Sequence, residues 1–181
     1  YQSLERIRTM LEDEVQIAVT EVNRITSEIA AINEEILKSE AAGDSPNDWL
    51  DRRDGLIEEL SDYVDITIDG SDPDEYNVHT GGYQLVQGTL AYRFEAVGNP
   101  DNEGFSDVVW AEGGEVTQFS DGKLAALLEL RDVDLRGEIQ SLDNMAVNFV
   151  DLVNEAHNAG YGLDGAGGRD FFVQLPFVEN A

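Results

Sequence analysis

The chain has 181 residues, of which 38 are Asp or Glu and 11 are Lys or Arg, so its formal net charge is −27 at pH 7. This length suits one compact domain, or a rod with a small second unit, and the 41% of hydrophobic residues argues against a wholly disordered chain. The charge excludes nucleic acid and anionic membrane as partners, because both need basic patches, and the absence of Cys excludes disulfides, thiolate metal sites and cysteine nucleophiles.

A long amphipathic helix is predicted over residues 2–41. Its apolar residues recur by steps of three and four on one helical stripe. They are Leu4, Ile7, Leu11, Val15, Ala18, Val22, Ile25, Ile29, Ile32 and Ile36. At 1.5 Å per residue this helix is about 60 Å long, so it needs a partner helix along its length. The stripe suits an intermolecular coiled coil, but two more amphipathic helices in the same chain favour intramolecular packing.

A second helix is predicted over residues 46–64, returning along the first. Gly43 can take the left-handed conformation that ends the first helix. Ser45 can then cap the second helix, with Pro46 in its first position and Asp48 in its acidic first turn. The two helices therefore form a hairpin.

Short runs of β-favouring residues, separated by turn-rich segments, follow from Asp65 onward. The runs are 66–68, 76–78, 84–86, 92–97, 108–110 and 116–119, and the turns include 69–74 and 98–102. Spacings this short favour hairpins and a meander over parallel crossovers. We expect a small antiparallel sheet at one end of the rod.

A third helix is predicted from about residue 120 to just before Gly160, and it should close the bundle. Its apolar residues include Leu142 and Phe149, which we expect to be buried. The predicted fold is therefore α+β: an elongated antiparallel bundle of about three long helices with a β unit between the second and third. We divide the chain into a helical hairpin (1–64), a β subdomain (65–119), a return helix (120–158) and a glycine-rich exit segment (159–181).

The motifs along this framework resemble the flagellar hook-associated protein family of the hook-filament junction (FlgK type). They are the segments 33–36, 51–61, 64–65, 81–88, 122–132 and 154–172. The chain departs from the family pattern at Ala125-Ala126, where glycine is more frequent, and at Gly162 and Asp164, where Asp and Asn are more usual. Residues 1–29 match only as a generic long helix. Because the chain starts inside a helical pattern, and neither end resembles the family's assembling termini, we expect a central fragment.

The resemblance implies a structural role in the bacterial flagellum, as an adaptor that links hook to filament through subunit packing. It implies the hook protein, the neighbouring junction protein and further copies of the chain as partners. It also implies a secreted location in an external flagellum, or a periplasmic one if the flagellum is enclosed. The isolated fragment should be a monomer or a weak oligomer. The absence of Cys fits export as an unfolded chain.

The sequence predicts no catalytic residue, no cofactor site and no metal site. His79 and His157 lie far apart in different predicted elements, whereas a zinc site needs clustered ligands. Five carboxylates lie close together in the predicted second helix: Asp51, Asp54, Glu58, Glu59 and Asp62. On a helix their spacing lines a solvated face, where Arg52 and Arg53 can pair with them. Around Asp164 and Asp170, the oxygen ligands of a calcium loop and the Lys of a phosphate loop are missing.

Two other functions remain open from the residues alone. A coiled-coil adhesin or a secretion-needle tip protein would use the β unit to recognise a ligand, and Tyr92 or Trp110 would anchor that contact. In small β units, however, such aromatic residues more often fill a core. A hydrolase would place its site within residues 155–172.

Overall fold

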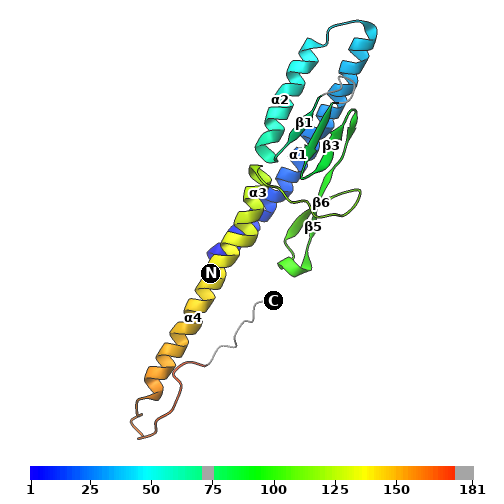
Figure 1. Cartoon of the computed structure of the whole chain (residues 1–181). Coiled ribbons are helices and arrows are strands. Elements are labelled where there is room, and N and C mark those ends of the chain that lie inside the picture. Colours follow the sequence, from blue (N-terminus) through cyan, green and yellow to red (C-terminus); the bar gives the residue numbers. More distant parts are fainter. Residues whose placement is uncertain (71–75, 174–181) are drawn as a thin grey trace.

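The computed structural model describes residues 1–70 and 76–173, and it is an elongated helical rod with an antiparallel β unit on one side (Figure 1). The elements are α1 (Gln2–Ala42), α2 (Asn47–Tyr63), β1 (Thr67–Asp69), β2 (Asn77–Thr80), β3 (Tyr83–Gln87), β4 (Leu90–Ala91), β5 (Phe94–Gly98), the 3-10 turn η1 (Pro100–Asn102), β6 (Ser106–Trp110), α3 (Gly122–Glu129), the π-helical turn η2 (Leu130–Asp134) and α4 (Leu135–Asn158). The predicted α+β class is confirmed. Most of the predicted turn 69–74, and the end of the predicted exit segment (174–181), lie outside the described residues.

Helix α1 begins and ends close to the predicted residues. Gly43 takes the left-handed conformation (φ 83°) and its N–H donates to the Glu40 carbonyl, which ends the helix. All the predicted stripe residues between Val15 and Ile36 are buried. The prediction is wrong near the N-terminus, where Ile7 is exposed and its neighbour Arg8 is buried instead.

Helix α2 packs antiparallel on the C-terminal half of α1, as predicted. Leu56 and Leu60 are buried against it and belong to the same apolar core. The predicted cap at Ser45 is wrong, because Pro46 occupies the N-cap position and no side chain bonds the first turn. Burial of the apolar face therefore stabilises this helix in place of a side-chain cap.

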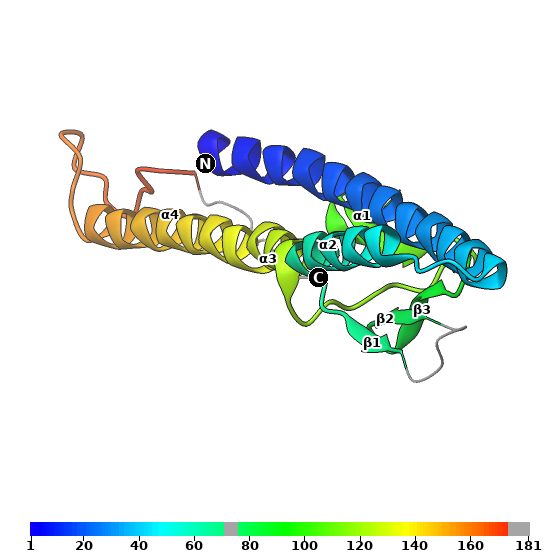
Figure 2. The same ribbon diagram turned by 90° about the horizontal axis from the view of Figure 1, so that it is seen from above.

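The C-terminal end of α2 meets the N-terminal end of α3. Gly122 has a φ of 89°, and a Cβ atom there would lie 2.6 Å from the Tyr63 carbonyl oxygen. Only glycine fits such a close approach in this conformation. Nearby, the Asp65 carboxylate accepts hydrogen bonds from the Ser120 N–H (3.2 Å) and hydroxyl (2.9 Å). As a result α2 and α3 follow each other along the same side of α1 (Figure 2).

This end-to-end arrangement makes one side of the rod longer than the other. At 1.5 Å per residue α1 is about 62 Å long, whereas α2 followed by α3, η2 and α4 measures about 80 Å. The far half of α4 therefore extends past the start of α1 (Figures 1 and 2). The prediction that Leu142 and Phe149 are buried is wrong, since they are 38% and 58% exposed. The start of α1 reaches as far as Asp143 and Asn144, which line a pocket together with Tyr1, and the rest of α4 extends past it.

The return helix also contains a π-helical turn that the periodicity did not predict. Residues Leu130–Asp134 form η2 between α3 and α4, and its Arg131 is completely buried. A π turn adds one residue to a helical turn, so the side chains beyond it change their angle around the axis. This turn lies against α1 and faces the buried side chain of Arg8.

The β unit is antiparallel, as predicted, and consists of two small sheets. One has the strand order β1-β2-β3-β4, and the other pairs β5 with β6. The short strand β4 was not predicted, and the predicted run 116–119 contributes only an isolated bridge between Val109 and Val116. Apolar side chains of β2, β3, β5 and β6 join the core formed by α1 and α2. The β unit therefore shares one core with the rod.

Candidate functional site

Four apolar side chains lie exposed along the far half of α4. The exposed fractions are 38% for Leu142, 66% for Met145, 58% for Phe149 and 65% for Leu152. They follow one another by three, four and three residues, the spacing with which a helix presents a seam to another helix. We call these four residues the α4 stripe.

The α4 stripe borders a shallow groove of about 560 Å³. Its lining residues are Ser141, Asn144, Met145, Asn148, Phe149 and Leu152. Grooves between the exposed side chains of a helix receive side chains of a second helix. Contiguous exposed apolar surface of this kind marks contact sites in folded proteins. The α4 stripe is therefore the best candidate for an interaction surface among the described residues.

The residues around the α4 stripe are acidic or neutral. Asp143, Asp151 and Glu155 lie on the same helix segment, and no Lys or Arg occurs in the sequence between Arg136 and Arg169. A partner surface with basic residues beside its apolar face would be attracted, whereas an acidic one would be repelled.

The exit segment folds back along α4 and contacts the α4 stripe at Phe149. The amide of Asn154, which is buried, accepts hydrogen bonds from the Phe171 and Phe172 N–H groups (2.9 and 2.8 Å) and donates to the Phe172 carbonyl (2.9 Å). This places the Phe172 ring 6.1 Å from that of Phe149. Asn154 is the first residue of the family motif 154–172, but its contacts with the exit segment were not predicted from the sequence.

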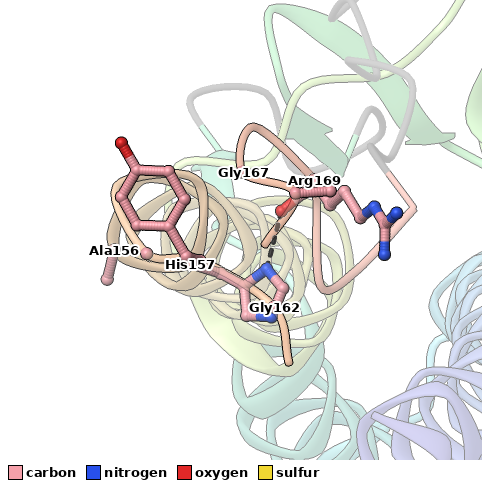
Figure 3. A pocket seen from close by; sticks show the side chains of 8 residues that line it. Ala156, His157, Gly162, Gly167 and Arg169 are labelled. Atoms are coloured by element: carbon pink, nitrogen blue, oxygen red, sulfur yellow. Dashed lines mark hydrogen bonds between the residues drawn. The ribbon is translucent and has the colours of Figure 1, made fainter. Parts of the chain in front are cut away.

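The loop that connects α4 to this segment surrounds a small pocket of about 390 Å³. Figure 3 shows the His157 ring beside the carbonyl of Arg169, with 2.6 Å between Nδ1 and the oxygen. Asp164 accepts a hydrogen bond from the Ala166 N–H (3.1 Å) and forms an ion pair with Arg169 (2.8 Å). These two contacts lower the pKa of the exposed Asp164 carboxyl, the first more strongly than the second. Asp170 accepts a hydrogen bond from Asn158 (2.5 Å), so both loop carboxylates are engaged in holding the loop.

The structure does not bring the two histidines together. His79 lies in β2, within the β unit, and His157 lies at the far end of α4 (Figure 1). Within residues 1–70 and 76–173, no group of three or more His, Asp or Glu side chains is arranged to hold a metal ion. The chain has no Cys to add to such a group.

Arg52 and Arg53 do not form ion pairs with the α2 carboxylates with which they were predicted to pair. Arg53 points inward, where it donates to the Asn33 side chain (3.1 Å) and lies over the Tyr76 ring (3.7 Å). Arg52 lies 3.9 Å from Glu28 of α1 instead of pairing with the α2 carboxylates. Because Arg53 joins Asn33 of α1 to Tyr76, the residue before β2, it has a structural role that the sequence did not indicate.

The aromatic residues weighed as ligand anchors have places in the core. Trp110 is buried, with its ring 4.4 Å from that of Phe94 and 5.7 Å from that of Tyr83. Tyr92 is half-buried and its hydroxyl donates to Gln87 (3.2 Å). Neither side chain extends from the surface as an anchor would.

Comparison with known proteins places this architecture in a family. Residues 1–172 match the profile of the flagellar hook-associated protein FlgK helical domain. The chain belongs to this FlgK family. It is 32% identical to flagellar hook-associated protein 1 of Escherichia coli K12 and 35% identical to that of Salmonella typhimurium, over 86% of the chain in both cases. The Bacillus subtilis protein of the same name is 29% identical over 94% of the chain.

A solved structure of the FlgK family has the same fold. The flagellar hook junction protein FlgK from Burkholderia pseudomallei superposes with a TM-score of 0.77 and 28% sequence identity, over 92% of this chain and 31% of that one. The chain spans about 30% of the length of the E. coli and Salmonella relatives and 39% of the Bacillus one. The comparisons therefore concern one part of a FlgK-type protein, its helical domain.

The motifs that suggested the FlgK family lie in several elements of the domain, and two of them include contacts between elements. Segment 51–61 is within α2, segment 81–88 includes the β2–β3 turn, and segment 122–132 runs from the close contact at Gly122 into η2. Segment 154–172 contains the Asn154 contacts of the exit segment. These positions fix the geometry of the domain.

Proposed function

We propose that the protein is a structural adaptor of the bacterial flagellum, joining hook to filament by subunit packing, and that the α4 stripe is one of its packing surfaces. The observation that carries the proposal is a helical seam left exposed in a chain of the FlgK family. The stiff pair of helices would transmit force along the rod, while the β unit and the loops would contact neighbouring subunits.

The proposed role is mechanical. Its support is the family, whose named members are hook-associated and hook junction proteins. The partners would be the hook protein, the neighbouring junction protein and further copies of the chain. The protein would act outside the cytoplasm, after export. None of the helices among the described residues is both long and apolar enough to cross a membrane.

A charge-insertion experiment tests the proposal. The full-length protein is produced with Met145→Asp, Phe149→Asp and Leu152→Asp in a flagellated strain that lacks its own copy. We expect export to continue and filament attachment to be lost, because carboxylates on an apolar seam cannot be buried without partners. The measurements are the amount of protein in the medium, filaments seen by electron microscopy, and swimming.

The matched control places the same three charges on exposed polar positions: Ser3→Asp, Asn47→Asp and Ser61→Asp. This variant should support filaments at the unmodified level. If the α4 stripe variant also assembles normally, the stripe is not a packing surface. If neither the unmodified protein nor any variant restores filaments, and purified hook protein does not retain the full-length protein, the adaptor role itself is wrong.

A further inference from the structure

The β5–β6 hairpin (94–110) is attached to the rod by apolar contacts at its base. The Phe94 ring lies 4.4 Å from Trp110 and 5.4 Å from Phe119, and all but Phe119 are buried. On the rod side, the Asn23 amide donates to the Phe94 carbonyl (2.8 Å) and accepts from its N–H (2.9 Å). The base is thus held by an apolar cluster and by one uncharged side chain.

The hairpin is a rigid arm beyond this base. Its strands pair continuously from Phe94 with Trp110 to Gly98 with Ser106. In the turn, the Asn99 side chain accepts from the Asp101 N–H (2.9 Å), and its amide donates to Asp107 (2.8 Å). Hydrogen bonds within the turn thus hold part of the shape of the tip.

The tip of the arm is attached to the rod mainly by charged groups. Apolar burial falls along β5, from Phe94 at 1% exposed to Val97 at 47%, whereas on β6 Val108 still belongs to the core at 1% exposed. Near the tip, Arg8 of α1 donates to Glu103 (2.8 Å), and Asn102 donates to Asp132 of η2 (3.0 Å). Glu103 has a φ of 57°, a conformation uncommon for a residue with a side chain, and it forms the ion pair from this position.

Arg131 in the π turn joins the tip to both parts of the rod. It donates to Glu12 of α1 (2.5 Å), to the Ser106 carbonyl of the arm (2.8 Å), and to Asp132 beside it (2.6 and 2.7 Å). Glu12 in turn accepts from the Ser106 hydroxyl (2.7 Å) and N–H (3.1 Å). The buried guanidinium of Arg131 thus has a charged or polar partner on α1, on the arm and on η2.

One aromatic side chain completes the attachment of the tip. The guanidinium carbons of Arg8 and Arg131 lie 4.5 and 5.6 Å from the centre of the Phe105 ring. A cation beside an aromatic face is attracted by the ring electrons. Even the apolar side chain of the tip is therefore held by the two arginines.

The charged groups that face one another here come from three elements: Arg8 and Glu12 of α1, Glu103 of the arm, and Arg131 and Asp132 of η2. Glu5, Arg136 and Asp143 line the neighbouring pocket. Removing one partner from a buried ionic group leaves the other charge uncompensated, so such a cluster tends to break as a unit. Two further polar links between α1 and the β unit, from the Asn23 amide to Phe94 and from the Asn33 amide to the Gly88 carbonyl (2.7 Å), are uncharged.

We propose that the outer part of the β5–β6 hairpin is a swinging arm, hinged where Asn23, Phe94 and Val108 hold its base, and that the Arg8–Arg131 charge cluster clamps its tip to the rod. When the cluster is intact the arm lies along the rod. When the cluster is broken the tip separates while the base stays in place. The domain then has two lateral shapes, which goes beyond the adaptor role proposed above and does not depend on it.

Distance measurements between spin labels test the arm. Because the chain has no Cys, introduced cysteines are the sole labelling sites. One pair joins the rod to the tip (Thr20→Cys with Asp101→Cys), and a second joins the rod to the loop at the base (Thr20→Cys with Glu112→Cys). With Arg131→Met, we expect a longer distance population to appear for the tip pair, and the base pair to stay unchanged.

The matched control is Arg24→Met, which removes an exposed arginine of α1 that forms ion pairs with Glu21 and Glu28 of the same helix. It should change neither distance. If Arg131→Met fails to fold, as judged by circular dichroism, the milder pair Asn102→Ala and Glu103→Ala removes clamp contacts from the tip alone. An unchanged tip distance in a folded clamp variant would overturn the proposal. So would an equal lengthening of both distances, because the whole β unit would then have detached.

Discussion

The two halves of the helical rod have the same kind of sequence pattern and opposite exposures. Where α1 faces α2 and the β unit, apolar residues such as Ile25 and Leu60 are completely buried. Along the far half of α4, residues at equally regular spacing, such as Met145 and Leu152, are about two-thirds exposed. A helical stripe thus specifies a face that can be buried, while the presence of a partner depends on where the other helices end.

The largest expected effect comes from removing side-chain volume in the buried half. Ile25→Ala should lower the free energy of unfolding by about 2–5 kcal/mol, because it leaves a cavity in a core that cannot fully collapse. Ile17→Ala is the matched control on the same helix, with a side chain that is 53% exposed. Urea unfolding, followed by circular dichroism, measures both. Equal losses for the two variants would contradict the burial described for α1.

The next largest effect on stability is expected at Gly122, where the end of α2 meets the start of α3. Gly122→Ala should destabilise the fold by roughly 2 kcal/mol, more than a simple propensity change, since the methyl group would meet the Tyr63 carbonyl and the φ is positive. Gly137→Ala in α4 has open space around its Cβ and should stabilise by about 0.5–1 kcal/mol. Thermal melting of both variants checks the opposite signs. A neutral Gly122→Ala would mean that α2 and α3 do not abut.

The clamp at the N-terminal end of α1 makes the fold sensitive to acid. Burial raises the pKa of Glu12, but hydrogen bonds from Ser106 and Gln16 and the charge of Arg131 outweigh it, so the pKa lies below its ordinary value. Burial also raises the pKa of Asp132. Hydrogen bonds from Arg131 and Asn102 outweigh this effect, so its pKa too lies below the ordinary value.

The sign of the pH dependence follows from these directions. A carboxylate whose folded pKa is depressed stabilises the fold above its unfolded pKa of about 4, and this stabilisation is lost as the pH falls through the folded pKa. We expect the urea midpoint to decrease below about pH 4, and to decrease less in the Glu12→Gln, Asp132→Asn double variant. The same steepness in both proteins would show that other groups cause the acid sensitivity.

The smallest expected effect concerns the exposed half. Met145→Ser should change the stability of the isolated chain by less than about 0.5 kcal/mol, as exposed substitutions usually do. A greater loss, measured by the same urea unfolding, would show that the α4 stripe is covered in solution, for example by a second copy. Analytical ultracentrifugation would then detect that association.

The position of each helix could be predicted from spacing and breakers, since these act locally. The end of α1 at Gly43 is one example, because a left-handed glycine ends a helix whatever surrounds it. The burial of Arg8 and Arg131 could not be predicted. An arginine on a helix is usually solvated, and these two are buried because three elements bring Glu12, Glu103 and Asp132 around them. The division of the chain into four units stays a prediction.

The order of the long helices and of most strands, the apolar stripes and the family resemblance could be derived from the sequence, because periodicity, turn residues and motifs are properties of neighbouring positions. The tertiary structure alone decided which stripes are buried, where the π turn places Arg131, and how the hairpin tip is attached. These depend on lengths and contacts between segments more than 90 residues apart, such as Arg8 and Glu103. Two helices laid end to end against one shorter helix leave part of α4 without a partner, and local sequence does not record that difference in length.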